Sequence, residues 1–175
     1  SKVEYTTTST NVPAATVGEW QIELKNYKNS LRFLTFTLRA ATDLTTSLLA
    51  RPYEVSRMRG ATSATPNTAE LKRWRLVTGG GEVLLDWQYT KHQLLVQHKM
   101  YFNSPAGAPI FGWYWDDNPV DELNTHGAFN FQSVLNPILV LDFAVAPAVD
   151  LNVQILASQW QMIQTVRGEI APQFA

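Results

Sequence analysis

The 175-residue sequence contains no cysteine, which excludes disulfide bonds and thiolate chemistry. Charge is also sparse: 17% of the residues are charged and the formal net charge is -1, against roughly 25% charged residues in an average protein. A nearly neutral chain has no overall field that attracts nucleic acid or an anionic membrane. The composition therefore predicts neither partner.

Long apolar runs are absent as well. No run approaches the roughly 20 residues needed to cross a bilayer. The N-terminal segment SKVEYTTTSTNVPAATVGEW is polar, without the basic and apolar regions of a signal peptide. These absences predict a soluble chain.

Motifs of catalysis and metal binding are lacking too. The spacing of His92 and His98 suits neither a helical nor a strand pair of ligands, and His126 lies farther along the chain. The segment TGGGE, residues 78–82, lacks the Lys-Ser/Thr ending of a phosphate loop and favours a hairpin turn. No Gly-x-Ser-x-Gly element occurs. The sequence therefore predicts no enzyme activity, no metal site and no cofactor.

What the sequence does contain is a series of short segments in which apolar and polar residues alternate, as in half-buried β-strands. Leu139, Leu141 and Phe143 fall on one face of such a segment, and residues 151–157 form another beyond an Ala/Pro turn. These two strands form either a hairpin or a corner between two sheets. Further strands are expected at 20–24, 34–38 and 109–115, and the clearest hairpin spans residues 74–85.

The number of strands and the length predict one all-β domain, a single eight-stranded jelly-roll barrel or sandwich with short helices in its loops. A helix is expected at 43–49, and residues 91–102 fit either a helix or a strand. The Thr- and Ser-rich residues 1–15 are expected to form an extended N-terminal arm, residues 16–170 the jelly roll, and residues 171–175 a C-terminal tail. We expect the arm and the tail to be mobile or exchanged between neighbouring molecules.

Charged residues are segregated along the chain. Residues 51–75 contain six Lys or Arg against two Glu, whereas residues 100–166 contain six Asp or Glu and no Lys or Arg. The two stretches either neutralise each other within one barrel or form opposite patches that orient neighbouring copies. The second arrangement makes candidate contact residues of Arg57, Arg59, Arg73, Asp116, Asp117 and Asp121.

An aromatic run, Trp113, Tyr114 and Trp115, allows a different function. Exposed rings of this kind form a sugar-stacking platform, whereas buried rings belong to a core strand or a protein interface. The exposed arrangement predicts a carbohydrate-binding β-sandwich module, which is the alternative function for this sequence.

The segment GAFNFQSVLNPILVLDF, residues 127–143, resembles a passage near the C-terminal end of the jelly rolls in major capsid proteins of the adenovirus-hexon-like lineage. The resemblance depends on Gly127, Asn130, Phe131, Ser133, Asn136, Pro137, Leu139 and Leu141. Members usually carry two barrels per chain, and 175 residues hold one. The sequence therefore resembles the single-jelly-roll branch, found in tailless icosahedral phages and archaeal viruses with an internal membrane.

This resemblance implies a structural capsid subunit that tiles an icosahedral shell with its barrel upright. The implied location is the virion, after synthesis in the host cytoplasm. The implied partners are copies of the chain itself and a second, larger capsid protein, with the underlying viral membrane contacted indirectly. Direct contact with nucleic acid and a small-molecule substrate are not implied.

Overall fold

The fold is that of a computed structural model, which describes residues 2–41, 70–88, 110–118, 121–124, 126–147, 149–161, 163–166 and 169–172. These residues contain strands, a short 3₁₀ turn at Phe131–Ser133 and no α-helix. The helix expected at 43–49 and residues 91–102, which fit either a helix or a strand, lie outside the described residues. In chain order the strands are β1 (Lys2–Val12), β2 (Gly18–Glu23), β3 (Ser30–Ala40), β4 (Glu70–Val77), β5 (Val83–Gln88), β6 (Ile110–Tyr114), β7 (Phe129–Asn130), β8 (Ile138–Val145), β9 (Leu151–Gln161), β10 (Ile163–Val166) and β11 (Glu169–Pro172).

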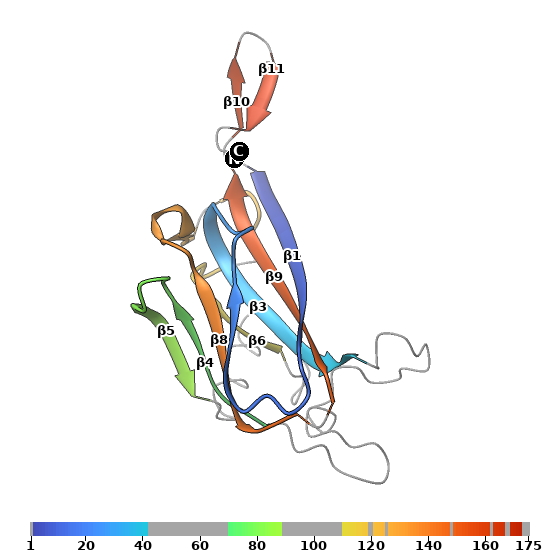
Figure 1. Ribbon diagram of the computed structural model, residues 1–175. Coiled ribbons are helices and arrows are strands. Elements are labelled where there is room, and N and C mark those ends of the chain that lie inside the picture. The colour runs from blue at the N-terminus through green and yellow to red at the C-terminus, as the bar shows by residue number, and fades with distance from the viewer. Residues whose placement is uncertain are drawn as a thin grey trace.

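Two antiparallel sheets face each other (Figure 1). One has the strand order β1-β9-β3-β6, with the short β7 also paired to β3, and the other has the order β2-β8-β4-β5. Strands that follow one another along the chain mostly belong to opposite sheets, and the first strand pairs with the ninth. This double-sheet arrangement is a jelly roll, so the predicted fold class is confirmed.

The two strands expected on either side of the Ala/Pro turn belong to different sheets. β8 lies in the sheet β2-β8-β4-β5 and β9 lies in the other sheet. Of the two arrangements that the sequence allowed, a hairpin and a corner between sheets, the structure therefore has the corner. Asp150 fastens this corner, because its side chain accepts a hydrogen bond from the Ala14 amide (2.7 Å) and its carbonyl accepts one from the Ala41 amide (2.8 Å). The hairpin expected around TGGGE is confirmed as β4 and β5.

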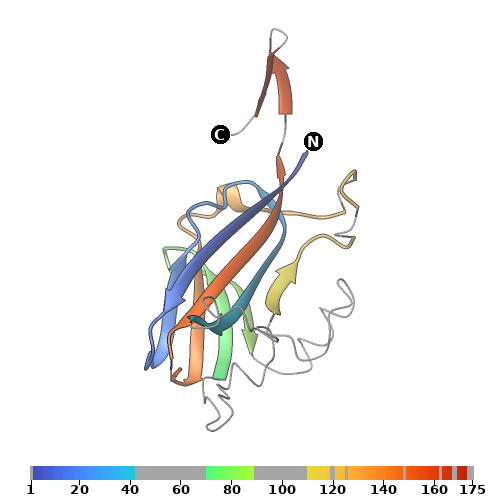
Figure 2. The same ribbon diagram turned by 90° about the vertical axis from the view of Figure 1, so that its right-hand side faces the viewer.

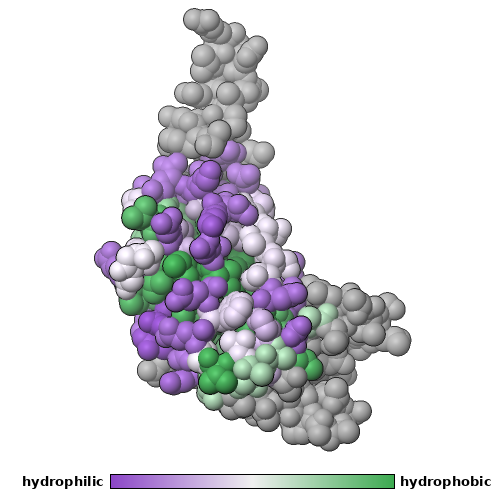
Figure 3. Space-filling view, in the orientation of Figure 1, coloured by the Kyte–Doolittle hydropathy of each residue, from purple (hydrophilic) through white to green (hydrophobic). Residues whose placement is uncertain are grey.

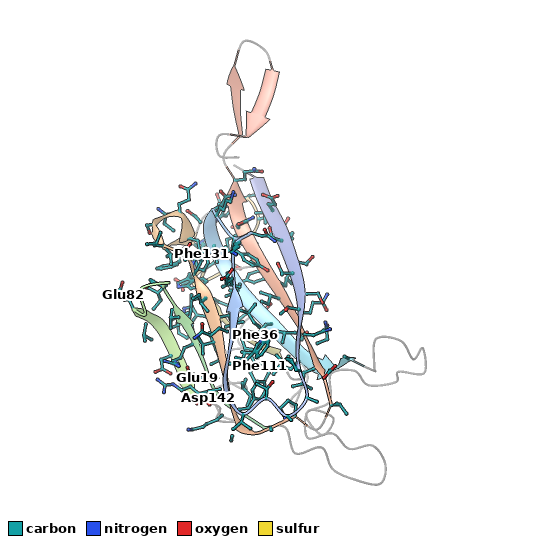
Figure 4. All side chains as sticks on the ribbon, in the orientation of Figure 1. Glu19, Phe36, Glu82, Phe111, Phe131 and Asp142 are labelled. Atoms are coloured by element: carbon teal, nitrogen blue, oxygen red, sulfur yellow. The ribbon has the colours of Figure 1, made fainter. Side chains whose placement is uncertain are left out.

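The core fills the space between the sheets. Leu139, Leu141 and Phe143 of β8 are buried, as the alternation predicted, and the apolar row of β9 is buried opposite them. Phe36 of β3 joins the two layers: its ring stacks on Phe111 with centroids 5.1 Å apart, and it meets Trp74 of the other sheet edge-on at 5.6 Å. Figure 4 shows Phe36 and Phe111 between the two sheets.

The N-terminal segment differs from the expected arm. Residues 2–12 form β1, which pairs with β9 from Lys2↔Gln161 to Val12↔Leu151 without a break in register. Val12 is fully buried. Low hydrophobicity favoured an arm, but backbone pairing with β9 and the strand preference of Thr side chains hold the segment in the sheet. Residues 2–12 therefore form a barrel strand within this chain, whereas mobility or exchange of the segment between molecules stays a prediction.

The C-terminal residues form a separate element. β10 and β11 pair only with each other, as a two-stranded hairpin that projects beyond one end of the barrel (Figures 1 and 2). The hairpin spans the boundary at residue 170 that was expected to separate barrel from tail. We refer to the end of the barrel next to this hairpin as the hairpin end.

Candidate functional site: the outer faces and the hairpin end of the barrel

The outer face of the sheet β2-β8-β4-β5 carries charges that are paired within the chain. Arg73 donates two hydrogen bonds to the Asp86 carboxylate, one of them from Nε at 2.5 Å, and Arg75 pairs with Glu19. The hydrogen bonds from Arg73 hold the pKa of Asp86 below its usual range, and the Asp86 carboxylate raises the pKa of Arg73. These charges neutralise one another on one barrel.

The same face carries another ion pair, between β4 and β8, with a longer distance between its charged atoms. Lys72 Nζ lies 3.8 Å from Asp142 Oδ2, with the lysine side chain mostly exposed. Figure 4 shows Asp142 and Glu19 on neighbouring strands of this sheet. Of the basic candidates for contacts between copies, Arg73 thus has an internal partner, while Arg57 and Arg59 lie outside the described residues.

The outer face of the opposite sheet is crossed by the segment after β6. Arg32, at a register irregularity in β3, is fully buried, and its Nε donates to Asp116 Oδ2 at 2.6 Å. Its Nη2 donates to the carbonyl of Asp121 at 2.6 Å, and its guanidinium lies 4.9 Å from the centroid of the Trp160 ring. The Arg32 carbonyl accepts the amides of Trp115 and Asp116. One arginine thereby fastens the whole segment to the sheet.

Beyond this anchor the segment is shaped by Asp121. The Asp121 carboxylate accepts hydrogen bonds from the Leu123 and Asn124 amides, and it lies 2.9 Å from His126 Nε2. The interaction with His126, followed by those with Asn124 and Leu123, holds the pKa of Asp121 well below its usual range. Among the described residues no group of His, Asp and Glu has the arrangement of a metal site.

Another hydrogen bond ties the segment to the first strand. Tyr5 donates from its hydroxyl to Glu122 Oε1 at 2.6 Å, which raises the pKa of Tyr5. With its backbone fixed at both ends, the segment presents Asp117 and Leu123 outward, and Leu123 is 86% exposed. We call residues 121–124 the Leu123 loop.

The acidic contact candidates therefore have three different roles. Asp116 is buried against Arg32, so its carboxylate is not presented at the surface of this chain. Asp121 organises its own loop. Asp117 is exposed. No local pattern indicated the role of Arg32, because its partner Asp116 is 84 positions away and only the folded register joins them.

The aromatic run is not an exposed row of rings: Tyr114 is buried, and Trp113 and Trp115 are half-buried. Tyr114 is 5% exposed and packs on Phe33 with ring centroids 5.4 Å apart, and burial raises the pKa of Tyr114. Trp113 and Trp115 pack against the core cluster, and Trp115 stacks on Phe129 at 5.2 Å. The three rings therefore do not form the exposed sugar platform that the alternative function requires.

A groove of about 1240 Å³ opens at the hairpin end. Its walls come from β1, from the end of β9 and from the segments 23–29 and 131–138. Gln159 in its wall is 4% exposed; its Nε2 donates to Thr6 Oγ1 at 2.8 Å, and its Oε1 has no hydrogen-bond partner within the described part of the chain. Polar and apolar residues alternate over the face shown in Figure 3. We call the groove lined by these segments the end groove.

The groove has an apolar side as well. Leu24 and Phe131 are buried in its floor, and Leu135 stands on its rim with 73% of its surface exposed. Tyr27 closes the lower part with a hydrogen bond from its hydroxyl to Thr8 Oγ1 at 2.8 Å. The end groove thus offers both apolar contact and amide groups to an occupant. Sequence reasoning did not predict it.

No helix among the described residues is long and apolar enough to cross a membrane. No family model and no curated protein matches the chain in sequence.

Solved structures do match. A chain of the PBCV-1 virus capsid aligns with 99% of this chain at a TM-score of 0.64 and 18% identity, and VP54 of PBCV-1, fitted into a reconstruction of the virophage Sputnik, aligns with 99% at 0.63 and 17%. The Faustovirus major capsid protein aligns with 90% at 0.61 and 10%. This chain spans 50% of the PBCV-1 proteins and 32% of the Faustovirus protein. At these identities the likeness establishes the fold, a jelly roll shared with viral capsid proteins.

Proposed function

We propose that this chain is a structural subunit of a viral capsid, and that its barrel stands upright in an icosahedral shell. The observation that carries the proposal is the alignment of nearly the whole chain with half of a PBCV-1 capsid chain, at a TM-score of 0.64. A wall-forming role also accounts for a chain whose conspicuous segments, β8 and β9, are buried scaffold strands.

The role is structural rather than catalytic. The titratable groups with shifted pKa values in the described residues are engaged in ion pairs, loop caps and the core, and they do not converge on one pocket. Tyr114 of the aromatic run is buried, and Trp113 and Trp115 are half-buried and packed against the core. Both features favour a capsid subunit over a sugar-binding module.

The partners in this proposal are copies of the chain and a second, larger capsid protein, above a viral membrane that the subunit meets indirectly. The virion is its destination and the host cytoplasm its place of synthesis. Among the candidate contact residues, Asp117 has the exposure that a contact requires. Arg57 and Arg59 remain candidates from their place in the basic stretch.

The proposal is tested on the purified chain by sedimentation velocity and electron microscopy at rising protein concentration. A capsid subunit self-associates into discrete oligomers or regular arrays, alone or after addition of a second coat protein from the same particle. A chain that remains monomeric under all these conditions would contradict the proposal.

Tryptophan fluorescence provides the matched control for the rival function. The chain has six tryptophans, and titration with oligosaccharides should leave their emission unchanged because Trp115 is stacked on Phe129 inside the fold. Saturable quenching without self-association would instead identify a carbohydrate-binding module.

A further inference from the structure

The edge strands of the two sheets differ in length. Among the described residues, the sheets end in β1 and β6 on one side of the barrel and in β2 and β5 on the other. β6 has five residues, β2 and β5 have six each, and β1 has eleven. A short edge strand limits pairing with other chains, because it offers few free N–H and C=O groups. β1 is the exception, and no strand of the part of the chain that the structure describes pairs with its outer edge (Figure 1).

β1 also lacks the other features that protect a sheet edge. Long edges are usually protected by charged side chains, by proline or by a β-bulge. β1 pairs with β9 in an unbroken register, so no bulge turns it away from an approaching strand. It contains no proline, and its only charged residues are Lys2 and Glu4. β1 therefore has the properties of a strand that adds to the sheet of another chain through its main chain.

The strand is accessible and already held in place. Every second side chain of residues 5–11 is exposed. The side chains between them are tied into the barrel, because Gln159 Nε2 donates to Thr6 Oγ1 and the Tyr27 hydroxyl donates to Thr8 Oγ1, each at 2.8 Å. A strand that is fixed in advance loses little conformational entropy when a second strand pairs with it.

The sequence of β1 is complementary to itself in the antiparallel direction. When all eleven residues of two such strands are aligned, Thr7 lies on a two-fold axis, opposite the same residue of the second copy. The charged side chains then meet uncharged ones, since Lys2 lies opposite Val12 and Glu4 opposite Thr10. The threonines at the centre of the strand face one another, and Thr–Thr pairs stabilise neighbouring strands. A second copy of this chain therefore fits the edge without any repulsion between like charges.

We infer that the outer edge of β1 pairs antiparallel with β1 of a second copy, about a two-fold axis at Thr7. The two sheets then form one continuous sheet with the strand order β6-β3-β9-β1-β1-β9-β3-β6. The inference rests on the proposed function, which requires copies to associate, and it names the surface of one such contact. Because both copies use the same surface, the contact closes at a dimer and leaves the other surfaces of the barrel for further contacts.

A charge exchange at the axis tests the contact. Thr7→Lys and Thr7→Asp each place two like charges directly opposite one another across the two strands. Sedimentation velocity in 0.1 M salt should show that each variant alone dimerises at least about fivefold more weakly than the unsubstituted chain. An equimolar mixture of the two variants should associate again, because opposite charges then meet at the axis.

Ser9→Lys is the matched control for the charge exchange. Ser9 is exposed on the same side of β1, and in the inferred pairing it lies about 13 Å from its counterpart, four residues along the strand. This separation exceeds the Debye length of about 10 Å at 0.1 M salt. Ser9→Lys should therefore dimerise as the unsubstituted chain does.

Disulfide trapping measures the register without background, because the chain contains no cysteine. Residues directly opposite in an antiparallel pair have Cα atoms about 4.5–5.5 Å apart, within the range that a disulfide spans. Oxidation with copper–phenanthroline should therefore link two Thr7→Cys chains. Ser9→Cys is the control, because its counterpart is too distant, and it should give at least about tenfold less linked dimer.

The outcomes separate this inference from the proposed function. Dimerisation that neither Thr7→Lys nor Thr7→Asp weakens, or a mixture of the two that does not recover, overturns the β1 contact and leaves the capsid role standing. Equal yields of linked dimer from Thr7→Cys and Ser9→Cys overturn it as well. Absence of association in the unsubstituted chain under every condition overturns both. Unchanged thermal unfolding of the variants verifies that the fold is intact, since both side chains are exposed.

Discussion

The two outer faces of the barrel each carry an Arg–Asp pair, and the pairs differ in burial. Arg32 and Asp116 have no exposed side-chain surface, whereas Arg73 and Asp86 are about one-third exposed. Water screens the exposed pair and solvates either partner left alone, but it does neither for the buried pair. An Arg–Asp pair therefore stabilises the fold on one face and contributes little to stability on the other.

The two outer faces also differ in what their charged pairs do. On the face of β1-β9-β3-β6, the buried pair fixes a crossing segment and so determines which residues are presented outward. On the face of β2-β8-β4-β5, charges lie directly on the strands and satisfy one another. Any molecule that approaches the second face would meet charges that are already paired with one another.

The largest effect should come from breaking the buried pair. Arg32→Met leaves the Asp116 carboxylate buried without its partner, which should lower the free energy of unfolding by about 3–5 kcal/mol. Urea unfolding followed by tryptophan fluorescence measures it. The double variant Arg32→Met, Asp116→Leu removes both charges and should be more stable than Arg32→Met alone. A loss below about 1 kcal/mol in the single variant would show that the pair is not structural.

A smaller loss is expected where the crossing segment returns to the sheet. Gly127 has φ +149°, and a Cβ there would overlap the Trp115 carbonyl oxygen. Gly127→Ala should cost about 1–3 kcal/mol, the range for strained backbone positions. Gly80→Ala is the control, because its nearest contact would be Thr78 Oγ1 at 3.7 Å. Equal midpoints of urea unfolding for the two variants would show that the segment adjusts freely.

The Leu123 loop itself should respond locally. Asp121→Ala removes the acceptor of the Leu123 and Asn124 amides, so hydrogen exchange at these amides should accelerate, while Asp117→Ala should have no effect. Because folding lowers the pKa of Asp121, its stabilising contribution is present above the unfolded value of about 3.9 and is lost as the pH falls through the lower folded pKa. In the unsubstituted chain, protection of the two amides should therefore persist at pH 4 and decline only in stronger acid.

The smallest effect is expected on the charged face. Arg73→Ala breaks an exposed pair, so any loss of stability at low salt should disappear in 1 M salt, where the Debye length is about 3 Å. Urea midpoints at both salt concentrations measure it. A loss that persists in 1 M salt would show that this pair is as structural as the buried one, and the contrast between the faces would fail.

Alternation along the chain was sufficient to predict the barrel strands that depend on local pattern. Leu139, Leu141 and Phe143 of β8, and the hairpin β4–β5, lie where the sequence placed them. The local pattern could not predict whether the chain forms a hairpin or a corner at residue 147. An alternating strand looks the same in either sheet, and the choice depends on its pairing partners.

Long-range pairing also explains what the sequence did not reveal. The strand β1 has few apolar residues, and its stability comes from the backbone of β9. Arg32 is the third residue of the apolar strand β3, and no local sign indicates that its charge will be buried. The charge segregation along the chain was real, but the register placed Arg73 beside Asp86 and Arg32 beside Asp116.

The pairing of Lys2 with Gln161 also constrains how the chain acquires its structure in time. β9 lies between β1 and β3, so neither neighbour is fully paired until β9 has been synthesised. Closing such a long loop costs entropy before any contact compensates for it, and folding dominated by distant pairings is slow. The local hairpin β4–β5 is free to form early, while β1 emerges from the ribosome first and waits longest for its partner. During that interval the unpaired edges of β1 and β3 are open to strands of other chains, so slow pairing with β9 exposes these edges to mispairing.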